Sequence, residues 1–105
     1  MNLLEPIEIE QRLRDLSEWH QEGKTIWKLY AFGSFRGSIE FIESVADIAE
    51  ENNHHPDIFI KFNQVKLIFS TWRDGGLTHR DFDLAKQIDE KFGSGTIGSP
   101  GQSPP

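Results

Sequence analysis

The spacing of apolar residues changes along this chain, and that change limits the folds open to it. Apolar residues recur every three or four positions in three segments and alternate singly in three others, and a fourth short segment, residues 19–22, is also predicted as a strand. The longer period predicts helices with one apolar face, and the alternation predicts strands with two unlike faces. The helical segments are residues 8–16, 35–52 and 78–92, and the strand segments are residues 19–22, 25–32, 57–62 and 65–71. The order αββαββα predicts an α+β fold, a four-stranded antiparallel sheet with three helices on one face.

The longest predicted helix carries two apolar stripes. One consists of Phe35, Ile39, Ile42, Ala46 and Ala49. The other, displaced by part of a turn, consists of Phe41, Val45 and Ile48. A helix in a small domain needs only one buried stripe. We therefore expect the second stripe to contact another subunit; the alternative is a single wide face deep in the core.

Length and composition indicate one globular domain. A chain of 105 residues can close a single core. Cysteine is absent, so disulfides and thiolate metal sites are excluded. We expect the domain to span residues 1–93, with Gly93 capping the last helix. Residues 94–105 lack periodicity, and we expect a flexible tail there.

The net charge and the hydropathy of the chain limit the kinds of partner that it can bind. The formal net charge of −6 argues against direct nucleic-acid binding, which requires clustered Lys and Arg. The N-terminus lacks a signal-peptide pattern, and no apolar run approaches the roughly 20 residues that span a bilayer. These features predict a cytoplasmic protein that does not bind membranes.

Two of the four histidines are adjacent, in the motif Asn53-His54-His55-Pro56. Imidazole has an ordinary pKa of about 6.5, which suits it to proton transfer. Pro56 favours an extended conformation at His55, and adjacent side chains on extended backbone point to opposite sides. Both rings can face one ligand only if the backbone turns at Asn53-His54. The plainer interpretation is a polar turn between helix and strand.

A wider set of residues around this motif resembles the signature of the pterin-4a-carbinolamine dehydratase family. The set is Glu50, His54, His55, Pro56, Phe62, Trp72 and Asp81, with Thr71 and Gly75-Gly76-Leu77-Thr78 continuing the match. The resemblance covers roughly residues 13–92. One position departs from it: the best-studied members carry a third histidine where this chain has Trp72.

The resemblance implies a fold, a reaction and a site. The family fold has three helices over four strands. Its reaction removes water from a 4a-hydroxytetrahydropterin to give a quinonoid dihydropterin, which supports tetrahydrobiopterin recycling and needs no cofactor or metal. His54 and His55 would be catalytic together with Asp81, and His55 would be the main proton-transfer residue. The implied substrate-binding residues are Glu50, Asn53, Pro56, Thr71, Trp72 and Arg73.

Several of these residues also have structural interpretations. An indole cannot carry protons, so Trp72 either stacks on the pterin, giving altered activity, or merely packs at a strand end. Asp81 has capping-box spacing from Thr78 and could instead pair with a histidine, or do both. Glu50 is expected to be a pocket wall or a histidine partner. His79 is expected to be a solvated residue of the first helical turn.

The resemblance also implies self-association, as a homodimer or homotetramer in which edge strands join two sheets. The alternative function is a non-catalytic interaction module on the same fold. Relatives act as a dimerisation cofactor of a homeodomain transcription factor, and others resemble RuBisCO assembly factors. The retained His54-His55 pair favours the enzyme, whereas Trp72 favours the module.

Overall fold

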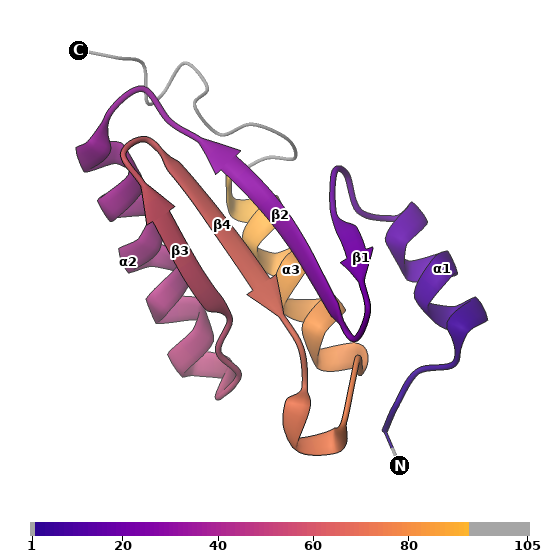
Figure 1. The fold of residues 1–105 in the computed structure, drawn as a ribbon. Coiled ribbons are helices and arrows are strands. Elements are labelled where there is room, and N and C mark those ends of the chain that lie inside the picture. Colours follow the sequence, from indigo (N-terminus) through magenta and orange to yellow (C-terminus); the bar gives the residue numbers. More distant parts are fainter. Residues whose placement is uncertain (1, 93–105) are drawn as a thin grey trace.

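The computed structural model describes residues 2–92, which form the predicted αββαββα order (Figure 1). The elements are α1 (Pro6–Arg14), β1 (His20–Glu22), β2 (Thr25–Ala31), α2 (Phe35–Asn52), β3 (Asp57–Lys61), β4 (Gln64–Phe69), a 3-10 turn (Trp72–Asp74) and α3 (His79–Phe92). The α+β prediction is confirmed. The predicted cap at Gly93 and the predicted tail lie outside the described residues.

The four strands form one antiparallel sheet in the order β1-β2-β4-β3. In the centre, Lys28 of β2 and Ile58 of β3 both lie opposite Leu67 of β4. Alternation along β4 buries Val65, Leu67 and Phe69 on one face of the sheet. That face supplies the floor of the core.

All three helices contribute to the core over this face. Ile9 of α1, Val45 of α2 and Ile88 of α3 belong to one cluster with the inward-facing strand residues. Figure 1 shows α2 and α3 behind the sheet and α1 beside β1. The expectation that the helices cover one face is confirmed.

The second stripe of α2 is not an intersubunit surface. Phe41 is 2% exposed, and Val45 and Ile48 are also buried within the single chain. Phe41 packs against the rings of Tyr30, Phe32 and Phe92. The prediction that this stripe contacts another subunit is wrong, because it is the stripe that faces the sheet. Phe35, on the other stripe, is 51% exposed.

A charged cluster lies inside the core, between β2 and α3. Lys28 Nζ donates to Asp89 Oδ1 at 3.0 Å, and the Tyr30 hydroxyl donates to the same oxygen at 3.0 Å. Trp19 Nε1 donates to Asp89 Oδ2 at 2.9 Å. Burial, followed by the negative charge of Asp89, raises the pKa of the Tyr30 hydroxyl far above its usual range. The carboxylate of Asp89 thus ties α3 to the sheet and to the segment before β1.

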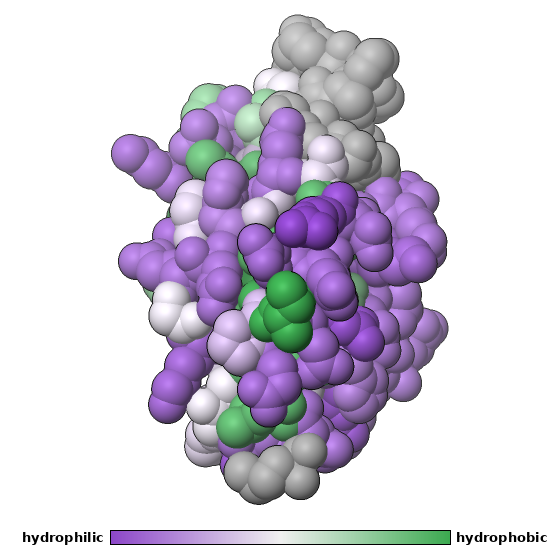
Figure 2. All heavy atoms as spheres, turned by 90° about the vertical axis from the view of Figure 1, so that its right-hand side faces the viewer, coloured by the Kyte–Doolittle hydropathy of each residue, from purple (hydrophilic) through white to green (hydrophobic). Residues whose placement is uncertain are grey.

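The side of the molecule that carries α1 is mostly hydrophilic, with small separate hydrophobic patches (Figure 2). Within residues 2–92, no helix has both the length and the apolar character needed to cross a membrane.

Candidate active site

The end of α2 turns the chain so that the two histidines reach a common space. Asn53 adopts a left-handed conformation, with φ 50° and ψ 43°. Its N–H donates to Glu50 O at 3.3 Å, and the N–H of His54 donates to Ala49 O at 3.1 Å. This is a Schellman motif, and Asn is one of the few residues that adopts this conformation readily. The sequence required a turn at Asn53-His54, and the structure contains it.

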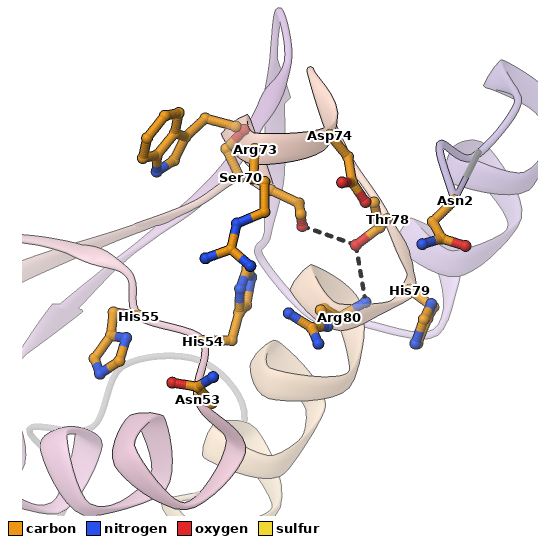
Figure 3. A pocket seen from close by; sticks show the side chains of 12 residues that line it. Asn2, Asn53, His54, His55, Ser70, Arg73, Asp74, Thr78, His79 and Arg80 are labelled. Carbon is orange, nitrogen blue, oxygen red and sulfur yellow. Dashed lines mark hydrogen bonds between the residues drawn. The ribbon is translucent and has the colours of Figure 1, made fainter.

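His54 and His55 line one cavity of about 470 Å³ at the end of the sheet (Figure 3). The volume lies within the range of small-molecule sites in proteins. The rest of the lining comes from the turn after α2, the segment after β4, the start of α3 and the N-terminal segment: Asn2, Asn53, Ser70, Thr71, Trp72, Arg73, Asp74, Thr78, His79 and Arg80.

His54 is the inner ring of the pair. Only 8% of it is exposed, and its ring stacks on Phe69 at a centroid distance of 5.9 Å and an interplanar angle of 16°. His54 Nε2 lies 2.7 Å from Asp81 Oδ1. An ionised carboxylate only accepts hydrogen bonds, so Nε2 carries the proton in this contact. Nδ1 is then the nitrogen that remains for a ligand.

Asp81 is fully buried and holds the inner ring from behind the cavity wall. Its Oδ2 accepts from the Thr71 hydroxyl at 2.8 Å and from the Thr78 N–H at 3.0 Å. The hydroxyls of Thr71 and Thr78 lie 2.8 Å apart. Asp81 therefore caps α3 and pairs with a histidine at the same time, so the two interpretations of its position are both correct.

His55 is the outer ring. Its Nε2 lies 2.5 Å from Glu50 Oε2, and both side chains are largely open to solvent. Glu50 precedes it by five residues, on the last turn of α2. The expectation that Glu50 serves as a histidine partner is confirmed. Each imidazole thus contacts a carboxylate through Nε2, one pair buried and the other exposed.

The segment after β4 forms the opposite rim. The Thr71 carbonyl accepts the N–H groups of Asp74, Gly75 and Gly76, which closes a tight turn. Gly75 has φ +91°, a conformation that side chains rarely adopt. Trp72, at the start of this turn, is 84% exposed. The interpretation of Trp72 as a residue that merely packs at a strand end is therefore wrong.

The structure brings most of the predicted site residues together. Asn53, His54, His55, Thr71, Trp72 and Arg73 line the cavity. Glu50 and Asp81 contact the histidines from outside its lining. Pro56 and Phe62 are not part of the lining, and Phe62 is exposed where β3 ends. The fixed φ of Pro56 constrains the backbone beside the two histidines.

Sequence reasoning missed several lining residues. Asn2 reaches the cavity because the N-terminal segment pairs with the chain before α3: Leu3 bridges to Thr78, and Leu4 N donates to Leu77 O at 2.9 Å. No local pattern signals that pairing. His79 and Arg80 lie beside the candidate site residue Asp81 in the sequence. That proximity could have identified them as residues that line the cavity. His79 is exposed, as expected, and it also borders the cavity.

The site is equipped for proton transfer. Two imidazoles offer a donor and an acceptor near neutral pH, and their carboxylate partners fix which nitrogen faces outward. Among residues 2–92, no group of three or more His, Asp or Glu side chains is arranged to hold a metal ion.

Comparison with known proteins agrees with this geometry. The family model described as pterin 4 alpha carbinolamine dehydratase matches residues 2–91. The chain belongs to this family. A relative from Roseiflexus castenholzii, named "Putative pterin-4-alpha-carbinolamine dehydratase", is 50% identical over 88 residues, which cover 84% of this chain and 95% of the relative. A relative of the same name from Sulfolobus acidocaldarius is 39% identical over 87 residues, covering 83% and 96%.

Solved structures share the pterin dehydratase fold. A crystal structure of a transcriptional coactivator/pterin dehydratase from Brucella melitensis superposes with a TM-score of 0.82 at 26% identity, covering 93% of this chain and all of that one. A pterin dehydratase-like protein, identified as a RuBisCO assembly factor in the alpha-carboxysome, superposes with a TM-score of 0.60 at 22% identity, covering 76% and 93%. The similarity to the RuBisCO assembly factor shows a shared fold and nothing more.

Proposed function

We propose that this protein dehydrates a 4a-hydroxytetrahydropterin to a quinonoid dihydropterin by histidine acid–base catalysis. The observation that carries the proposal is the pair of imidazoles, His54 and His55, lining one cavity while each contacts its own carboxylate. In such a role the protein would return the pterin to the tetrahydrobiopterin cycle that serves aromatic amino-acid hydroxylases.

The reaction needs two proton transfers. The C4a–O bond breaks and the departing hydroxyl takes a proton to leave as water, while a base removes a proton from a ring N–H. No net proton is gained or lost. A positioned donor and acceptor typically accelerate such a step by about 10²–10⁴-fold.

The surroundings of the two rings suggest how they divide this work. The buried Asp81 contacts His54 Nε2 at 2.7 Å and orients the ring, so that Nδ1 is left for a ligand. We assign His54 as the proton donor through Nδ1. His55 faces solvent beside the exposed Glu50 and can release a proton to water, so we assign it as the acceptor.

Trp72 has a binding role in this proposal. Its exposed indole borders the cavity, and a flat aromatic face suits stacking on a fused heterocycle. The indole nitrogen cannot accept a proton, so Trp72 takes no part in the transfers.

The test is to generate the carbinolamine in situ and to follow its dehydration optically. We expect His55→Ala to reduce the enzyme-catalysed rate about 10²–10⁴-fold. His20→Ala is the matched control, because His20 is exposed on β1 and lies outside the cavity lining. Trp72→His should raise the rate if a third proton carrier helps.

Wild-type protein that is no faster than the spontaneous reaction would overturn the enzymatic proposal. The non-catalytic interaction module would then be the better account, with the exposed Trp72 as part of its contact surface.

We also propose that the chain forms a homodimer or homotetramer. β3 is an outer strand of the sheet, and within the described residues no strand pairs with its far edge. An open strand edge presents unpaired N–H and C=O groups to a second copy.

A further inference from the structure

Two buried threonine hydroxyls support the carboxylate behind His54, and the direction of each of their hydrogen bonds can be assigned. The Thr71 hydroxyl has one proton, which it donates to Asp81 Oδ2 at 2.8 Å. In its contact with the Thr78 hydroxyl, which is also 2.8 Å long, Thr71 therefore accepts and Thr78 donates. The Thr78 oxygen in turn accepts the Arg80 N–H at 3.2 Å (Figure 3).

This order of donors determines how the carboxylate meets the histidine. Asp81 Oδ2 accepts two donors, the Thr71 hydroxyl and the Thr78 N–H, the second at 3.0 Å. Oδ1 contacts Nε2 of His54 at 2.7 Å. The carboxylate cannot rotate without breaking a buried hydrogen bond, which is costly. Oδ1 therefore stays aligned with Nε2, and Nδ1 remains the nitrogen for a ligand.

The backbone of Thr71 is fixed as firmly as its side chain. Its carbonyl accepts the N–H groups of Asp74, Gly75 and Gly76, and its own N–H donates to Gly76 O at 3.0 Å. The turn closed by these bonds carries Trp72, which borders the cavity. Thr71 thus sets the rim that carries the indole through its backbone and the inner histidine through its hydroxyl.

The hydroxyl of Thr71 has no substitute nearby. Within residues 2–92, every buried side-chain nitrogen and oxygen has a hydrogen-bond partner. Removing one hydroxyl from such a network leaves an acceptor short of a donor, and the neighbouring groups shift in response. Because the Thr71 proton is donated to Asp81, this hydroxyl acts on a substrate through His54.

We propose that Thr71 is a positioning residue of the candidate active site: its hydroxyl holds Asp81 so that His54 keeps a proton on Nε2 and exchanges a proton with the substrate through Nδ1. This inference rests on the proposed function, because it concerns the same proton transfer. A ring that has donated from Nδ1 remains in the Nε2–H form, which is the form that pairs with the carboxylate. Nδ1 can then take a proton back from water before the next turnover.

NMR of the imidazole protons tests this positioning without turnover. The isotope-labelled full-length protein should show the neutral His54 ring protonated at Nε2, with a proton that exchanges slowly with water because its acceptor is buried. Thr71→Val keeps the shape of the side chain and removes the hydroxyl. We expect this exchange to become faster by about tenfold or more, because Asp81 loses a hydrogen bond to a charged group. Thr71→Ser keeps the hydroxyl and should resemble the wild type.

The dehydration rate provides a second measurement. Partners behind metal-bound histidines typically contribute about 10–100-fold to activity, so we expect Thr71→Val to lower kcat about 10-fold and to change KM by less than about twofold. Thr25→Val is the matched control, because the Thr25 hydroxyl donates to Glu22 O at the exposed turn between β1 and β2, outside the cavity lining. That control should change neither the exchange rate nor kcat.

Unfolding curves show which variants are folded. Should Thr71→Val not fold, Thr78→Val takes its place, because it removes the donor to the Thr71 oxygen and keeps the Thr78 N–H that caps α3. Exchange at His54 should again become faster, by a smaller factor than for Thr71→Val, since Asp81 keeps both of its Oδ2 donors.

A folded variant without the hydroxyl that exchanges at the wild-type rate would overturn the inference. A Thr71→Ser variant as disturbed as Thr71→Val would also overturn it, because the methyl group and not the hydroxyl would then matter. Unchanged exchange in Thr71→Val together with normal wild-type dehydration would leave the proposed function standing. The expected exchange behaviour in a protein that does not dehydrate the carbinolamine would remove the proposed function instead.

Discussion

At the scale of single residues, the two imidazole–carboxylate pairs differ in burial and not in geometry. His54 and Asp81 contact each other inside the protein, whereas His55 and Glu50 meet at the surface. A surface pair is screened by water and contributes little to stability. The buried pair is different, because removing one partner would leave the other without compensation. Asp81 therefore supports the fold as well as the inner histidine, and Glu50 can be replaced at a smaller structural cost.

Tyr30 gives a prediction about pH. Its pKa is raised above the usual range by burial and by Asp89, while in the unfolded chain it is about 10. Above that pH the unfolded chain loses the proton and the folded chain keeps it. The stabilisation is therefore fully present below about pH 10 and declines above it, by about 1.4 kcal/mol per pH unit. Denaturant unfolding of the wild type and of Tyr30→Phe should differ by this slope.

The same substitution has a cost at neutral pH. It removes the hydrogen bond to the charged Asp89, so we expect a loss of roughly 1.5–3 kcal/mol in the free energy of unfolding. Tyr30 is the only tyrosine, so tyrosinate absorbance reports on it alone. Tyrosinate appearing near its ordinary pKa while the fold is intact would contradict the prediction.

The sequence predicted the residues with local signals and missed those placed by distant contacts. Pro56 required a turn before His55, and the spacing from Thr78 indicated the capping role of Asp81. Lys28 lies in a predicted strand segment with no local sign of its partner, yet it is fully buried against Asp89, 61 positions further along. No periodicity encodes a contact of that separation, because Lys and Asp are usually exposed.

At the scale of elements, the ends of α2 were predicted as they are observed. Which of its apolar stripes faces the sheet was not predicted. Ser34 caps its N-terminus by accepting the Gly37 N–H at 3.0 Å, and Asn53 ends it. These local signals fix the length. The two apolar stripes are offset by part of a turn, so only the packed structure decides which of them faces the sheet. Phe41 faces it and Phe35 does not.

A pair of matched substitutions in α2 tests that orientation. Phe41→Asp removes a buried ring and buries a charge, so we expect a loss of more than about 3 kcal/mol. Much of the stability of a small domain, typically about 5–15 kcal/mol, would disappear. Phe35→Asp replaces an exposed ring in the first turn, where a negative charge is favourable, and should change stability by less than about 1 kcal/mol. Denaturant unfolding distinguishes them, and the reverse order would refute the assignment.

At the scale of the whole molecule, the sheet has one face in the core and one open face. Phe59 on β3 and Leu29 on β2 point away from the helices, and both are exposed. Trp27 on the same face is covered by Lys66, whose Nζ lies 4.6 Å from the ring centroid. The sequence indicated two unlike faces through its alternation. It could not show that Lys66 covers Trp27, because no local pattern encodes a contact between two strands.

Phe59 provides the test of self-association. It is 60% exposed on an outer strand, so a second copy pairing along β3 would bury it. We expect the wild type to scatter light as a dimer or tetramer and Phe59→Asp to scatter as a smaller species, because a charge in that contact would lose its water. Glu43→Gln serves as a control, since Glu43 is exposed on α2. An unchanged mass for Phe59→Asp, with its unfolding curve also unchanged, would show that association does not use this strand.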